Sequence, residues 1–149
     1  MKSLFDTAAA DEVCSRIDRL TAQSQRQWGK MDVAQMLAHC AAAMEMACGD
    51  HNPKQMFIGR LIGGRLKHHL TNDVPMKRNA PTGGTLKIQE PRDIERERAR
   101  LKELVRRFSQ GGEAKCTRHP HMFFGRLEPQ EWAMGMYKHI DHHLQQFGV

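Results

Sequence analysis

Three of the nine histidines fall within five residues near the C-terminus, in the segment MYKHIDHHLQQFG. His139 and His143 are four residues apart, so in a helix they lie on one face, about one turn apart. Such a pair can offer two neutral imidazole nitrogens to Zn, Ni, Cu or Fe. The same spacing also occurs in basic surface patches, so the pair alone leaves both interpretations open.

A third ligand would have to come from another helix, and His39 is the candidate. It stands in QMLAHCAAAMEMAC, a segment in which Glu45 is the only carboxylate. A helix that is apolar around most of its circumference is buried, and a buried imidazole is costly without a partner. His39, His139 and His143 therefore form a candidate metal site. The alternative is that each histidine is a hydrogen-bonded structural residue.

Capping residues and hydrophobic spacing predict four main helices that would position these side chains. They begin near Asp6 or Thr7, at Asp32, near Asp93 and at Pro129, and they end near Leu20, at Gly49, at Gly111-Gly112 and at Gly148. Asp32 and Gln35 have the spacing of a capping box. We expect one all-α domain over residues 1–149.

Two connections are irregular in this interpretation. Residues 56–70 are expected to form a short helix weakened by Gly63-Gly64. Residues 71–90, which contain Pro75 and Pro81, are expected to form a long irregular connection, the excursion, with a short extended piece at LKI. Residues 113–127 form a second irregular segment. It carries His119 and His121 just before the last helix.

Composition limits the partners. The net charge of +6 and the arginines between 96 and 107 suggest nucleic acid, but glutamates alternate with them as on a solvated helix face, so no nucleic-acid partner is expected. No stretch reaches the ~20 apolar residues of a membrane span, and no membrane partner is expected. The N-terminus has no signal-peptide pattern and the four cysteines form no CxxC pair. These features predict a cytoplasmic chain with reduced thiols.

QWGKMDVAQMLAHC followed by HxxxH in the last helix resembles the DinB-like superfamily, and CTRHPHMFFGRLEPQEWAMGMYKHIDHHLQQFG resembles an uncharacterised DinB-related family of bacterial proteins. The resemblance implies an up-down-down-up four-helix bundle with a long crossover between its second and third helices. It also implies that His39, His139 and His143 bind a divalent metal, Zn or Ni first, with Fe, Mn or Cu as alternatives. A homodimer is expected on the same ground.

Three protein ligands leave an open coordination position. Such a position can activate a water or a thiol. The resemblance implies a metal-dependent transferase, including thiol transferases, or a hydrolase, with a small molecule or a thiol as substrate. His119 and His121 are the catalytic candidates, and Glu45 is a candidate for supporting the ligands. The alternative is a non-catalytic ligand-binding or stress-related helical module without a metal.

Overall fold

The computed structural model describes residues 1–80 and 82–149; Pro81, which we assigned to the long excursion, lies outside them. The regular elements in these residues are helical, as expected from the sequence. In chain order they are α1 (Thr7–Asp18), α2 (Val33–Cys48), the π-helical turn η1 (Gly59–Gly63), α3 (Gly64–Leu66), α4 (His68–Thr71), the 3-10 turn η2 (Gly84–Leu86), α5 (Ile94–Lys115) and α6 (Pro129–Gln146).

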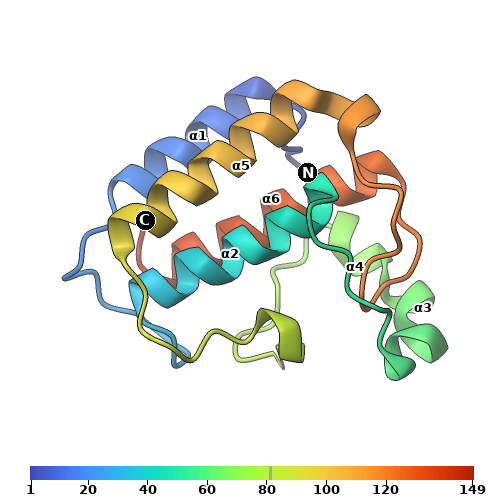
Figure 1. Ribbon diagram of the computed structural model, residues 1–149, viewed down its shortest axis with the longest axis horizontal. Helices are drawn as coiled ribbons and strands as arrows, with labels where there is room; N and C mark the ends of the chain where they lie inside the picture. The colour runs from blue at the N-terminus through green and yellow to red at the C-terminus, as the bar shows by residue number, and fades with distance from the viewer. Residues whose placement is uncertain (81) are drawn as a thin grey trace.

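The four long helices enclose the core. α1 and α2 each pack against both α5 and α6, and the chain between α4 and α5 runs back along α2 before α5 begins (Figure 1). Most of the largest fully buried side chains come from α1, α2, α5 and α6, and they include Ile17, Met44, Leu101 and Trp132. Burial of these apolar faces is the main force that holds the four helices together.

Local capping sets most helix ends where the sequence predicted them. The Asp6 carboxylate accepts the N–H of Ala8, and Asp32 and Gln35 form a complete capping box. Gly49 ends α2 with a φ of 83°, a left-handed conformation that favours glycine. The predicted end of α5 was only partly right: Gly112 breaks the helix with a φ of 55°, but helical turns continue to Lys115.

Residues 57–71 form a nearly continuous but irregular helical segment, as the paired glycines indicated. It lies close to the backbone of the loop before α6: a Cβ on Gly59 or Gly63 would come within 2.4 Å or 1.9 Å of the Phe123 carbonyl oxygen. The Lys138 ammonium of α6 also donates to the carbonyl of His69. Glycine is therefore required for close backbone contact at two positions of this segment.

The expectation of an extended LKI piece was wrong in part. Leu86 ends the 3-10 turn η2, and Lys87 after it is extended. This turn packs against α2.

The close contact at Gly63 gives a direct test. Gly63→Ala should destabilise the protein by about 1–3 kcal/mol, because the new methyl group overlaps the Phe123 carbonyl. Gly64→Ala is the matched control: a Cβ there meets nothing within 4 Å, and Gly64 has helical φ and ψ. The control should be neutral or more stable by up to ~1 kcal/mol. Urea unfolding measures both, and equal effects would contradict the proposed contact.

Candidate metal centre

The structure brings His39, His139 and His143 together between α2 and α6. One ligand atom from each residue can be chosen so that all three lie within 4.8 Å of one another. The His39 and His139 Nε2 atoms are 2.9 Å apart, and the His143 ring lies with its centroid 4.8 Å from each of the other two. This group could hold a metal ion.

The orientation of His39 is fixed by the excursion before α5. Its Nδ1 lies 2.8 Å from the carbonyl oxygen of Leu86 at the end of η2. A carbonyl can only accept, so Nδ1 carries the proton of the neutral ring and Nε2 presents a lone pair to the other histidines. His39 is 3% exposed, which removes water as a competing partner.

The orientation of His143 is fixed by the connector between α1 and α2. Its Nδ1 lies 2.8 Å from Gln146 Oε1, and Gln146 Nε2 donates to the Trp28 carbonyl at 2.6 Å. The second bond sets the amide so that its oxygen faces His143. A Cβ on Gly29 would lie 2.4 Å from Gln146 Nε2, so the connector needs glycine at this point. His143 therefore also holds its proton on Nδ1 and has a free lone pair on Nε2.

The surroundings of the third ring, His139, indicate whether the group fits a metal. Its Nδ1 is buried and has no hydrogen-bond partner among the described residues. Two nitrogens that bind one ion at about 2.1 Å lie about 3.0–3.4 Å apart when the angle at the ion is between right-angled and tetrahedral. The 2.9 Å between His39 and His139 is within a few tenths of an ångström of this separation. The three residues therefore fit a metal through nitrogen donors.

Burial keeps the three rings neutral. Desolvation lowers the pKa of His39, and it lowers the pKa of His143 to about 3. For His139, desolvation and then the neighbouring histidines lower the pKa well below its ordinary value. Metals bind the deprotonated nitrogen, so the rings have the required protonation state at neutral pH without any metal.

The structure separates the two catalytic candidates. His121 packs against the Trp132 ring of α6, with ring centroids 5.2 Å apart, and its Nδ1 accepts the backbone N–H groups of Phe123 and Phe124. Burial lowers its pKa to about 4. His119 is exposed, and no interaction in the described residues joins its side chain to the three histidines.

Glu45 does not support the ligands. Its carboxylate lies 2.6 Å from the Arg100 guanidinium of α5, so it joins α2 to α5 and does not contact the three histidines. The sequence analysis missed the groups that do support the ligands, namely Gln146 and the carbonyls of Leu86 and Trp28. Only Gln146 carried a signal, since it is three residues after His143 on the same helix.

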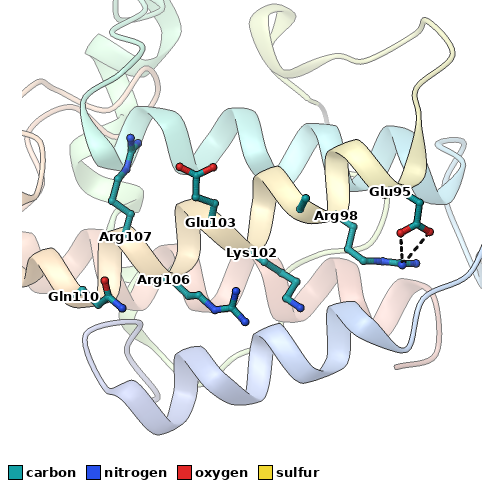
Figure 2. A pocket seen from close by; sticks show the side chains of 8 residues that line it. Glu95, Arg98, Lys102, Glu103, Arg106, Arg107 and Gln110 are labelled. Carbon is teal, nitrogen blue, oxygen red and sulfur yellow. Dashed lines mark hydrogen bonds and ion pairs between the residues drawn. The ribbon is translucent and has the colours of Figure 1, made fainter.

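A separate shallow groove runs along one face of α5, and its lining residues all come from that helix (Figure 2). Several of the cations along it are paired: Arg98 with Glu95, Lys102 with Asp18, and Arg107 with Asp50. Such pairing neutralises much of the charge that a nucleic acid would require. The geometry agrees with the solvated charged face suggested by the alternating signs.

Fold and site together define an all-helical protein with a buried group of three histidines that could hold a metal ion. The chain belongs to the family described as "Protein of unknown function (DUF1569)", which it matches over residues 2–148. No curated protein and no solved structure matches it. Within the part of the chain that the structure describes, we find no helix with the length and apolarity of a membrane span.

The support of His143 by Gln146 predicts an effect on metal affinity. Gln146→Met removes the acceptor of the Nδ1 proton and should weaken Zn or Ni binding about 10- to 100-fold. The matched control is Gln145→Met, because Gln145 is exposed and contacts Asp141 instead. Competition titration against a chromophoric chelator measures both affinities, with circular dichroism to verify folding. Equal affinities in the two variants would show that Gln146 does not support the ligand.

The lowered pKa values predict acid sensitivity of the metal-free protein. His121 and His143 have folded pKa values of about 4 and about 3, against an unfolded value of about 6.5. The unfolded chain therefore takes up protons first as the pH falls. The contribution of these histidines to the free energy of unfolding should be complete above about pH 6.5. Below this pH the free energy of unfolding should fall by up to ~1.4 kcal/mol per pH unit for each such histidine.

Urea unfolding with a chelator, between about pH 7 and pH 5, tests this dependence above the range of ordinary carboxylates. A His121→Gln variant should show a shallower decline than the parent, because one of the neutral buried rings is gone. A stability that does not change over this range would contradict the neutral, buried state of the rings.

Proposed function

We propose that the chain is a DinB-like metal-binding protein in which His39, His139 and His143 hold one divalent ion, Zn or Ni first. The observation that carries the proposal is the fixed tautomer of two of the three rings. The Leu86 carbonyl and Gln146 each take an Nδ1 proton, which leaves Nε2 lone pairs directed into the group. Hydrogen bonds from outside the ligands with this pattern are typical of protein metal sites.

We further propose a metal-dependent transferase or hydrolase that acts on a small molecule or a thiol. A bound divalent ion with three protein ligands would supply an open position and a Lewis acid for a water or a thiol. The chain itself would orient the ligands and exclude water by burial. Because Nδ1 of His121 accepts two backbone N–H groups, its neutral ring holds a proton on Nε2 and can donate a hydrogen bond to a substrate. His119, at the exposed rim of the same loop, is the second candidate.

The finer description of the fold is part of the same proposal. The mutual packing of α1, α2, α5 and α6 supports an up-down-down-up four-helix bundle with its long crossover between α2 and α5. The family match over residues 2–148 supports a single domain. A cytoplasmic homodimer is the assembly we propose from the resemblance to DinB-like proteins.

A second candidate is a ligand-binding module without a metal. The 2.9 Å contact between the Nε2 atoms of His39 and His139 favours it, since a direct hydrogen bond there would satisfy both atoms. In that module the buried Nδ1 of His139 is an unpaired acceptor, and with a metal on Nε2 it would be an unpaired donor, so this atom alone does not separate the two functions.

Metal content separates the two functions. Protein purified without a histidine tag or added metal should contain about one divalent ion per chain by elemental mass spectrometry. A His139→Ala/His143→Ala variant should contain none, and His142→Ala, which changes the adjacent histidine, should keep the ion. A folded parent protein that contains no metal and takes up neither Zn nor Ni on titration would refute the metal function and favour the module.

A further inference from the structure

The helical segment 57–71 carries four large apolar side chains that are exposed. Phe57 is 76% exposed, Ile58 48%, Leu61 59% and Ile62 38%. They stand in two pairs four residues apart, so they form one block on the outward side of the segment. Single exposed apolar residues are ordinary, but four adjacent ones on one helical face mark an interaction surface.

The opposite side of the segment is fixed, so these residues do not turn into the core. Gly59 and Gly63 are buried and contact the backbone at Phe123. The Met56 N–H also donates to the Met122 carbonyl at 2.8 Å. Because the inner side is made of glycine and backbone, the large apolar side chains point outward.

The charge around this block is of one sign. Residues 51–72 contain no aspartate or glutamate but include Lys54, Arg60, Arg65 and Lys67. Lys67 pairs with Glu131 of α6. Lys54, Arg60 and Arg65 are exposed, and no ion pair within the described residues involves them. An apolar block is therefore bordered by unpaired cations.

We propose that this face docks on an anionic lipid surface. Phe57, Ile58, Leu61 and Ile62 enter the boundary between headgroups and acyl chains, and Arg60 and Arg65 contact lipid phosphates. Docking of this kind is peripheral and needs no membrane-spanning helix. It depends on segment 57–71 alone and does not rest on the proposed metal function.

The charge argues against a second copy of the chain as the occupant. In a symmetric contact the same patch meets itself, so Arg60 and Arg65 of both copies would enter one interface, and residues 51–72 supply no acidic residue to pair with them. A lipid surface supplies both the apolar phase and the anions that the face lacks. It also accepts a convex block of side chains without a matching groove.

Vesicle flotation tests the proposal. The full-length protein should float with vesicles of equal parts phosphatidylglycerol and phosphatidylcholine at low salt, and not with phosphatidylcholine alone. Phe57→Ser/Leu61→Ser should abolish binding, and Arg60→Gln/Arg65→Gln should weaken it roughly tenfold or more. Arg96→Gln/Arg106→Gln removes the same charge from exposed positions on α5 and should bind like the parent.

Three results would overturn the proposal. The first is no flotation of the parent protein with anionic vesicles at low salt. The second is equal loss in the α5 control, which would mean unspecific attraction of a basic protein. The third is a dimer, seen by analytical ultracentrifugation, that dissociates in Phe57→Ser/Leu61→Ser, because a second copy would then cover the face. Circular dichroism of each variant verifies that the exposed substitutions leave the fold intact.

Discussion

The burial of three imidazole rings between α2 and α6, in a group that contains no carboxylate, is the constraint on which the site depends. Each ring has two polar nitrogens, and a buried nitrogen needs a partner. The helices bring the rings together but do not satisfy them. Two of the three outer nitrogens have partners, the Leu86 carbonyl for His39 and Gln146, held by the Trp28 carbonyl, for His143. The Nδ1 of His139 has none among the described residues. The irregular parts of the chain thus decide which nitrogen faces the centre.

The same burial that costs stability prepares the rings as ligands. Desolvation opposes the charged imidazolium, so the folded state keeps the rings neutral with available lone pairs. A nearby carboxylate would have stabilised the imidazolium form, in which both ring nitrogens carry protons and neither can bind a metal. His121 follows the same rule in the adjacent loop, since its buried ring is neutral and its Nδ1 is used by two backbone donors.

Features of the fold and the site could be predicted from the sequence where the interacting residues lie close together along the chain. The ends of α2 and the start of α6 were predictable because Asp32, Gln35, Gly49 and Pro129 act on their own helices. The meeting of His39 with His139 and His143 followed from helical periodicity and the apolar character of α2. The supports at Leu86 and Trp28 were not predictable, because any residue offers a carbonyl and only the path of the loop selects one. Glu45 was misassigned for the same reason: its partner, Arg100, lies 55 residues away on another helix.

Segment 57–71 connects the surface of the molecule with the loop beside the site. A Cβ on Gly63 would lie 1.9 Å from the Phe123 carbonyl, so the two backbones are in contact with no side chain between them. The loop that carries Phe123 also carries His121, whose orientation depends on the N–H groups of Phe123 and Phe124. Packed interiors do not absorb displacement freely. The segment that carries the apolar face therefore also holds in place the backbone that orients His121.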